Sequence, residues 1–199
     1  LHDIGHAPFS HTCENLFSYK EKINNKNSKI NKELLAEIKS HLDDPAYHVF
    51  EKDYFSLIMK NPPAPHEIMS SIITCRKFGD YNKFFESENI NSLNLDLIVR
   101  SIIGCCYSYK RTDDEDKRLE LGIKNCLIRL LNSSTVDVDK LDYIARDTQM
   151  SGYDSIVLDN KRLLDNVCIV DNDGIYYPAF GKGALSVLNN VVIAKNSQA

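Results

Sequence analysis

Apolar side chains recur at helical spacing along most of this 199-residue chain, and this periodicity constrains the fold more than any other feature. Leu34, Leu35 and Ile38 are one example of the spacing. A short apolar segment on each side of Asp171-Asn172-Asp173-Gly174 is typical of a β-hairpin. The sequence therefore predicts a mainly α-helical fold with one small hairpin. The predicted helices cover residues 34–42, 47–60, 66–73, 94–107, 118–132, 137–150 and 183–195, and the predicted strands cover 167–170 and 175–177.

The composition limits the classes of function. A formal net charge of -4 argues against a strongly basic surface for nucleic acid. The sequence contains no run of about 18 apolar residues, so it predicts no transmembrane helix. The six cysteines form no C-x-x-C pair, which argues against a structural zinc site and favours free thiols in a reducing compartment. We therefore expect a cytoplasmic protein with no membrane segment and no strong binding to nucleic acid.

Two local patterns bear on the organisation of the chain. Gly5 and Pro8 predict a helix end, a turn and a new helix start within residues 1–17. Residues 20–34 are rich in Lys and Asn, which predicts an exposed, mobile segment that buries little. The chain opens with Leu1 and runs directly into a dense polar motif, so we interpret it as a fragment of a longer protein.

The polar motif at the start of the chain contains three of its six histidines, His2, His6 and His11. On a helix, His2 and the adjacent Asp3 can both reach one ion, and His6 lies on the same face as His2. Imidazole and carboxylate are suitable ligands for Mn, Fe, Zn or Ni. A further histidine beside them can protonate or orient a phosphate. The pattern predicts a metal site, although surface or capping residues are the simpler alternative.

A second polar pattern lies on the predicted helix 137–150. Asp139, Tyr143 and Asp147 recur every four residues and so form one stripe, with Lys140 beside its start. A solvated helix face is the usual fate of such residues. The mixture of carboxylates with Tyr and Lys also suits a hydrated polyphosphate and a sugar, which favours a binding role.

Both patterns belong to longer motifs. The first reads His2-Asp3-Ile4-Gly5-His6-Ala7-Pro8-Phe9-Ser10-His11, and the second, Asp137–Asp147, fits D-x-D-K-x-D-Y-x-x-R-D at every fixed position. These motifs resemble the signatures of the HD superfamily of metal-dependent phosphohydrolases, most closely the deoxynucleoside triphosphate triphosphohydrolases. The resemblance covers roughly residues 1–17, 66–80 and 97–199, and it leaves 18–65 as an insertion atypical of the family. It implies a single HD domain of helical fold, whose N-terminal ligand helix and C-terminal part lie outside residues 1–199.

The resemblance also implies a role for individual residues. The metal ligands would be His2, Asp3 and Asp139, completed by a histidine that precedes Leu1 in the family. The catalytic group would comprise His6, His11 oriented by Glu14, and His66 oriented by Glu67. The substrate would be bound by Lys140, Tyr143, Asp147 and Lys195. Two positions depart from the family, which more often has Asp at position 14 and often has Arg at position 195.

The implied activity is hydrolysis of deoxynucleoside triphosphates to deoxynucleoside and tripolyphosphate with one divalent metal ion: Mn, Fe, Zn, Ni or Mg. Family members are often homo-oligomers. Two alternatives stay open at this point. One is an HD phosphohydrolase that acts on another nucleotide, although Gly152-Tyr153-Asp154 differs from the Gly-Tyr-Pro signature of the cyclic-dinucleotide subclass. The other is a non-catalytic nucleotide-binding or assembly module.

Overall fold

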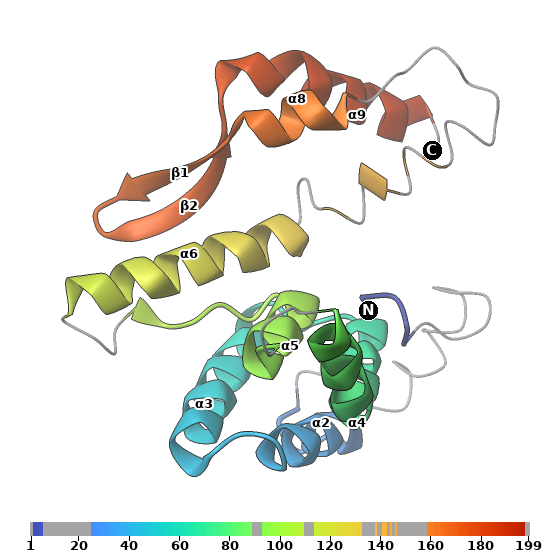
Figure 1. Ribbon diagram of the computed structural model, residues 1–199, viewed down its shortest axis with the longest axis vertical. Coiled ribbons are helices and arrows are strands. Elements are labelled where there is room, and N and C mark those ends of the chain that lie inside the picture. The colour runs from blue at the N-terminus through green and yellow to red at the C-terminus, as the bar shows by residue number, and fades with distance from the viewer. Residues whose placement is uncertain are drawn as a thin grey trace. The chain divides into compact units, whose positions relative to one another are not determined.

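The computed structural model describes residues 2–5, 25–88, 93–109, 114–132 and 159–197, together with positions 138, 141, 142, 144 and 146. The chain forms two compact units, Leu1–Ser108 and Tyr109–Ala199, and each is described by itself (Figure 1). The predicted fold class is confirmed, because the described residues are mainly helical with one antiparallel hairpin. None of the described helices combines the length and the apolar character needed to cross a bilayer.

The first unit contains four described helices: α2 (Lys29–Lys39), α3 (Asp44–Lys60), α4 (Pro65–Ser87) and α5 (Leu95–Ile103). Helix α4 contacts both α2 and α5, and α2 also contacts α3 (Figure 1). The burial of apolar side chains between these helices supplies the main favourable contribution to folding of this unit. The fully buried residues of this hydrophobic core include Leu34, Ile38, Phe50, Tyr54, Ile58, Ile68, Ile72, Cys75 and Val99.

The prediction that residues 20–34 bury little is wrong for the part that the structure describes. Helix α2 begins at Lys29, and both Asn31 and Leu34 are fully buried. Burial of Asn31 is possible because its amide oxygen accepts a hydrogen bond from the Tyr54 hydroxyl (2.8 Å) and its amide nitrogen donates to the carbonyl of Asn25 (3.0 Å). A buried polar group that is hydrogen-bonded in this way carries little penalty, and composition alone does not reveal the partners.

Helix α4 is longer than predicted, since it continues from Pro65 to Ser87. Pro65 occupies the first helical turn, where a missing N–H costs nothing. The second half of the helix is tied to α2 by Arg76, whose guanidinium donates to Glu33 and Glu37 at 2.7 Å each. Helix α5 is shorter than predicted, because Gly104 adopts a left-handed conformation (φ 67°) and caps it.

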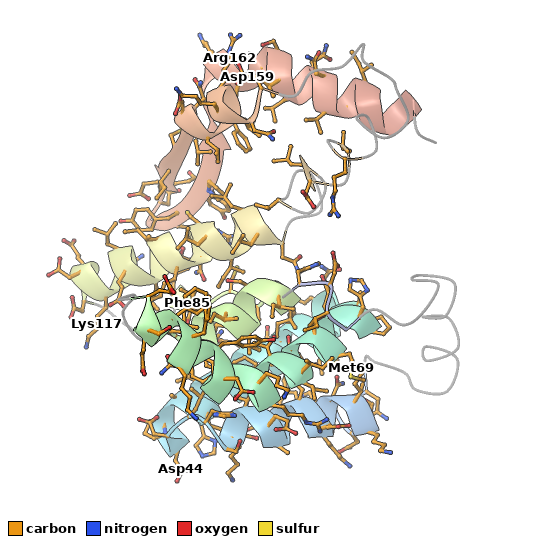
Figure 2. All side chains as sticks on the ribbon, turned by 45° about the vertical axis from the view of Figure 1, so that its right-hand side comes forward. Asp44, Met69, Phe85, Lys117, Asp159 and Arg162 are labelled. Carbon is orange, nitrogen blue, oxygen red and sulfur yellow. The ribbon has the colours of Figure 1, made fainter. Side chains whose placement is uncertain are left out.

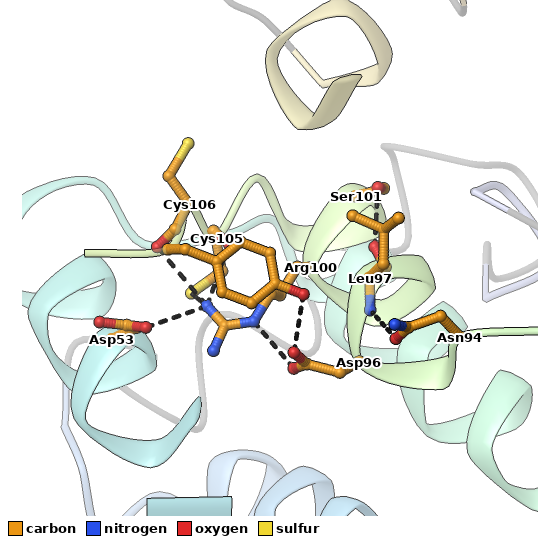
Figure 3. A network of polar contacts seen from close by, with 9 residues as sticks. Asp53, Asn94, Asp96, Leu97, Arg100, Ser101, Cys105 and Cys106 are labelled. Carbon is orange, nitrogen blue, oxygen red and sulfur yellow. Dashed lines mark hydrogen bonds and ion pairs between the residues drawn. The ribbon is translucent and has the colours of Figure 1, made fainter. Parts of the chain in front are cut away.

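A fully buried arginine joins α3 and α5 to the segment that follows α5 (Figure 3). Arg100 donates through Nε to Asp96 (2.8 Å) and through Nη1 to Asp53 (3.1 Å). Its guanidinium lies 4.0 Å from the ring centroid of Tyr107, and the Tyr107 hydroxyl donates to Asp96 (2.7 Å). Nη1 also lies within hydrogen-bonding distance of the carbonyl of Cys105 (3.4 Å). A charge buried this deeply is tolerated because two carboxylates pair with it through Nε and Nη1, although Nη2 has no hydrogen-bond partner among the described residues.

The second unit contains α6 (Glu115–Leu131), α8 (Asn160–Asp165), β1 (Val167–Asn172), β2 (Ile175–Phe180), a 3-10 turn (Lys182–Ala184) and α9 (Leu185–Ser197). Strands β1 and β2 form the predicted hairpin, with Asn172 paired to Ile175. Asp173 and Gly174 have positive φ values of 53° and 76°, as a tight hairpin turn requires. Strand β2 packs on α6, where the ring of Tyr176 covers Gly122 so closely that a side chain at position 122 would collide with it.

The short helix α8 was not predicted from the sequence. Asp159 caps it by accepting a hydrogen bond from the backbone N–H of Arg162 at 2.9 Å (Figure 2). Between α6 and α8, the described positions Val138, Leu141, Asp142, Ile144 and Arg146 are all helical, in agreement with the predicted helix 137–150. Ile144 is fully buried, and Leu141 packs against a small core formed by Leu163, Ala184 and Val187.

Candidate metal centre

The start of the chain is a turn, residues 2–5, that is docked on α4 through one serine. The Ser70 hydroxyl donates a hydrogen bond to the carbonyl of His2 (2.5 Å) and accepts one from the backbone N–H of Gly5 (2.8 Å). We expected the end of a helix here, but residues 2–5 form a turn whose backbone groups are paired with the Ser70 side chain. Ser70 is buried, so this docking is shielded from water.

Gly5 is required at this turn because its backbone lies directly against α4. A Cβ atom at this position would lie 2.5 Å from the carbonyl oxygen of His66 and 2.8 Å from Oγ of Ser70. Both distances are far below van der Waals contact, so any larger residue would push the turn away from the helix. The sequence indicated Gly5 only as a turn residue, and the close approach to α4 is a finding of the structure.

Docking of the turn brings His2 and Asp3 to His66, near the start of α4. One ligand atom from each of these three residues lies within 4.8 Å of the other two, a grouping that could hold a metal ion. Nδ1 of His2 is 3.2 Å from Oδ1 of Asp3, close to the roughly 3 Å that separates neighbouring ligand atoms around one ion. The His2 and His66 rings lie edge to face, with centroids 5.9 Å apart.

The candidate centre is open to solvent on one side. The side chain of Asp3 is 51% exposed and that of His2 is 29% exposed, whereas His66 is half-buried. A bound ion would therefore keep coordination positions that a water molecule or a phosphate oxygen could reach, the property that distinguishes catalytic from purely structural metal sites.

Glu67 lies on the other side of the His2 ring, with its Oε1 atom 3.5 Å from Nε2 of His2. Hydrogen bonding to Glu67 is the largest cause of a rise in the pKa of His2 to about 9; burial opposes the rise and Asp3 adds to it. In the absence of a metal, His2 is therefore protonated at neutral pH. A metal ion that binds His2 must displace that proton.

The structure thus brings together four of the predicted site residues, His2, Asp3, His66 and Glu67, and it places them in the first unit. The geometry makes His66 a candidate ligand, whereas the resemblance implied an acid or base. Lys195 lies in α9, with its side chain outside the described part. The other predicted site residues lie outside the described residues: His6, His11, Glu14, Asp139, Lys140, Tyr143 and Asp147.

Sequence reasoning missed Ser70, the residue that holds the turn of His2 and Asp3 against α4. One signal for it was present, because Ser70 follows His66 by four residues and therefore shares its face of α4. A serine on the same face as a candidate ligand is common on any helix, so the spacing alone carried little weight. Ser70 has this role through two hydrogen bonds, one with Gly5, which is 65 positions away in the sequence, and one with His2, which is 68 positions away.

Substitution of Gly5 by Ala is expected to weaken the binding of Zn²⁺ or Mn²⁺ by at least about tenfold, because the turn that carries His2 and Asp3 can no longer dock on α4. Isothermal titration calorimetry measures the change. Gly79→Ala on α4 is the matched control, since a Cβ there meets no atom within 4 Å. It should leave metal binding unchanged and stabilise the helix by about 0.5–1 kcal/mol. Wild-type metal affinity in Gly5→Ala would contradict the docking argument.

Comparison with known proteins adds two relatives. No family model matches the chain. Over 197 residues it is 25% identical to "Uncharacterized protein MG461" of Mycoplasma genitalium and 26% identical to "Uncharacterized protein MG461 homolog" of Mycoplasma pneumoniae. Each match covers 98% of this chain and 33% of the relative, so the chain spans about a third of the length of these curated relatives. The names of the relatives state no activity, and the functional argument therefore rests on the residues of this chain.

Proposed function

We propose that this chain is the metal-dependent phosphohydrolase core of an HD-domain enzyme, and that it hydrolyses deoxynucleoside triphosphates to deoxynucleoside and tripolyphosphate. The observation that carries the proposal is that His2 and Asp3 meet His66, from a segment far away in the sequence, at one candidate ion site. The two sequence motifs give the same chemistry independently of that geometry. The same resemblance supports a homo-oligomer, and the cysteine pattern supports a cytoplasmic location.

The donor set fits one divalent transition metal. Two imidazoles and a carboxylate suit Mn, Fe, Zn or Ni, whereas Mg²⁺ prefers oxygen ligands and is the least suited of the five candidates. Asp139 would add a second carboxylate, as the motif Asp137–Asp147 implies. A divalent ion held by these residues would lower the pKa of a water molecule and neutralise charge on a phosphate.

The residues of the chain would supply the remaining steps of hydrolysis. The oxygen of water, after losing one proton to the solvent, would form a bond to the α-phosphorus while the bond from that phosphorus to the 5′ oxygen of the sugar breaks. His11, oriented by Glu14, would give a proton to the leaving 5′ oxygen. Lys140 and Lys195 would neutralise the negative charge of the departing tripolyphosphate.

The choice of a nucleotide substrate rests on the polar stripe of the predicted helix 137–150, and the deoxy sugar is what the resemblance implies. Tyr143 and Asp147 follow Asp139 at four-residue spacing in the second motif, and by resemblance they would bind the sugar of the substrate. His6 would orient a phosphate, as the resemblance of the first motif implies. This arrangement favours a nucleoside triphosphate over a phosphate ester that lacks a sugar.

The affinity of the site for a metal ion is expected to rise with pH. The pKa of His2 is raised from 6.5 to about 9, so over this interval a proton must leave His2 each time a metal binds. Affinity for Zn²⁺ should therefore rise by up to about tenfold per pH unit below pH 9 and level off above it. Titration calorimetry at a series of pH values measures the slope, and an affinity that does not change across this interval would contradict the proton displacement.

The products of hydrolysis test the proposed function. The full chain would be incubated with Mn²⁺ and a panel of deoxynucleoside triphosphates, and the released phosphates would be separated by ion-exchange chromatography. Release of tripolyphosphate is the expected result. Release of orthophosphate or pyrophosphate would replace the proposal with another phosphohydrolase activity, and nucleotide binding without any release would replace it with a non-catalytic module.

A further inference from the structure

Glu67 contacts two different parts of the molecule through its two carboxylate oxygens. Oε2 accepts a hydrogen bond from the backbone N–H of Ala64 at 2.6 Å, at the start of α4. Oε1 lies 3.5 Å from Nε2 of His2. Ala64 occupies the capping position and has no side-chain acceptor of its own, so Glu67 satisfies a backbone donor at this end of the helix. The carboxylate is therefore held by the helix start while it faces the ring of His2.

The ring of His2 lies between two carboxylates that occupy different positions relative to the candidate ion. Nδ1 faces Asp3 at 3.2 Å, and Nε2 faces Glu67. Among the described residues, the group whose ligand atoms lie within 4.8 Å of one another consists of His2, Asp3 and His66 and does not include Glu67. The Nδ1 side of the ring is thus the side shared with another ligand, and the Nε2 side faces a carboxylate outside the ligand group.

We propose that Glu67 is the positioning residue of the metal centre: it accepts the Nε2–H of His2 and so leaves Nδ1 free to bind the ion. This inference rests on the metal site of the proposed function. A neutral imidazole carries one proton, and the hydrogen bond made by one ring nitrogen decides which nitrogen binds the metal. Carboxylates that accept the second N–H of a ligand histidine fix the orientation of the ring and strengthen it as a ligand.

This role differs from the one expected for Glu67 from the sequence, where it was assigned to the orientation of His66. The placement found here makes one side chain responsible for both the first turn of α4 and the orientation of His2. His66 is the residue that precedes Glu67 on the same helix. Two of the three candidate ligands therefore depend on how α4 begins.

The substitution Glu67→Gln separates the two contacts of this side chain. A glutamine oxygen still accepts the N–H of Ala64, so α4 should begin normally. The other end of the amide is an NH2 group, which cannot accept the Nε2–H of His2, and affinity for Zn²⁺ is expected to fall 10- to 100-fold. Glu86→Gln is the matched control, because it removes the same charge from the other end of α4, where Glu86 accepts a hydrogen bond from Asn82. It should bind Zn²⁺ like the wild type.

Two measurements on the full chain test the proposal: titration calorimetry with Zn²⁺, and ¹⁵N nuclear magnetic resonance of the histidine rings in the zinc-loaded chain. The expected spectrum shows His2 bound through Nδ1 and protonated at Nε2, with its signals assigned by their loss in His2→Ala. Zinc on Nε2 of His2, or a Glu67→Gln chain that binds Zn²⁺ as tightly as the wild type, would overturn the role of Glu67 alone. A wild-type chain that binds no Zn²⁺ would instead overturn the metal site on which this role rests.

Discussion

Replacement of Arg100 by Met is expected to lower the free energy of unfolding of the first unit by about 3–5 kcal/mol. Arg100 is fully buried and neutralises Asp53, whose side chain is 5% exposed, and Asp96, whose side chain is 21% exposed. Without the guanidinium, the two carboxylates are left in a poorly solvated position without their cation. The contact with Tyr107 in the segment after α5 is lost as well. Urea unfolding followed by circular dichroism measures the change.

Arg76→Met on α4 is the matched control for this prediction. Arg76 forms two ion pairs at 2.7 Å, with Glu33 and Glu37, but its side chain is 51% exposed. Water and salt screen such pairs, so its loss should cost much less than the loss of Arg100. Adding Asp53→Asn and Asp96→Asn to Arg100→Met should recover part of the stability, because no buried charge then lacks a partner. If Arg76→Met and Arg100→Met lowered the free energy of unfolding equally, the buried ion pairs of Arg100 would stabilise the unit no more than exposed ones do.

Replacement of His66 by Ala is expected to remove bound metal and hydrolytic activity together. His66 groups with His2 and Asp3 as a candidate ligand, and loss of a ligand should weaken Zn²⁺ or Mn²⁺ binding by more than about 100-fold, beyond the effect of an outer-shell change. The resemblance gave His66 a different role, as an acid or base, and under that role His66→Ala would keep its metal and lose only turnover. Metal content measured by mass spectrometry beside tripolyphosphate release separates the two roles.

His48→Ala is the control for this substitution, because the His48 side chain is 70% exposed and belongs to no motif. It should keep both metal and activity. Asp139→Ala extends the test to the second motif, where a ligand role rests on the sequence alone. It should lose metal and activity together, like His66→Ala, and a fully active Asp139→Ala chain would remove Asp139 from the ligand set.

The fold class and most helices could be predicted from the sequence because they depend on local signals. The spacing of Leu34, Leu35 and Ile38 indicated a helix, and Asp171–Gly174 indicated the hairpin turn; both are present. Helix ends were less predictable. The end of α5 depends on Gly104 in a left-handed conformation, and apolar residues on both sides of that glycine hid the boundary.

The burial of individual polar residues could not be predicted, because it depends on hydrogen-bond partners that lie far away in the sequence. Buried Asn31 accepts a hydrogen bond from the Tyr54 hydroxyl, and buried Arg100 donates one to Asp53. These partners are 23 and 47 residues away in the sequence. A pattern read along the chain assigns such side chains to the surface, where most polar residues lie.

In the candidate site, too, features set by neighbouring residues could be predicted and features set by distant contacts could not. His2 and Asp3 were predicted as ligands from their motif, and the structure places them together with His66. The docking of the turn on Ser70, and the position of Glu67 against His2, depend on contacts between the turn and α4 that no local pattern contains. The candidate ligands could thus be predicted from residue types, whereas the contacts that position them are found only in the tertiary structure.

The proposed function requires that His2, Asp3 and His66 hold one divalent ion together. X-ray absorption spectroscopy at the zinc edge, on the zinc-loaded full chain, identifies the ligands of that ion. We expect one equivalent of zinc with nitrogen and oxygen ligands at roughly 2.0–2.2 Å, including at least two imidazole rings. Failure to retain zinc, or a zinc ion surrounded by oxygen ligands without imidazole, would contradict it.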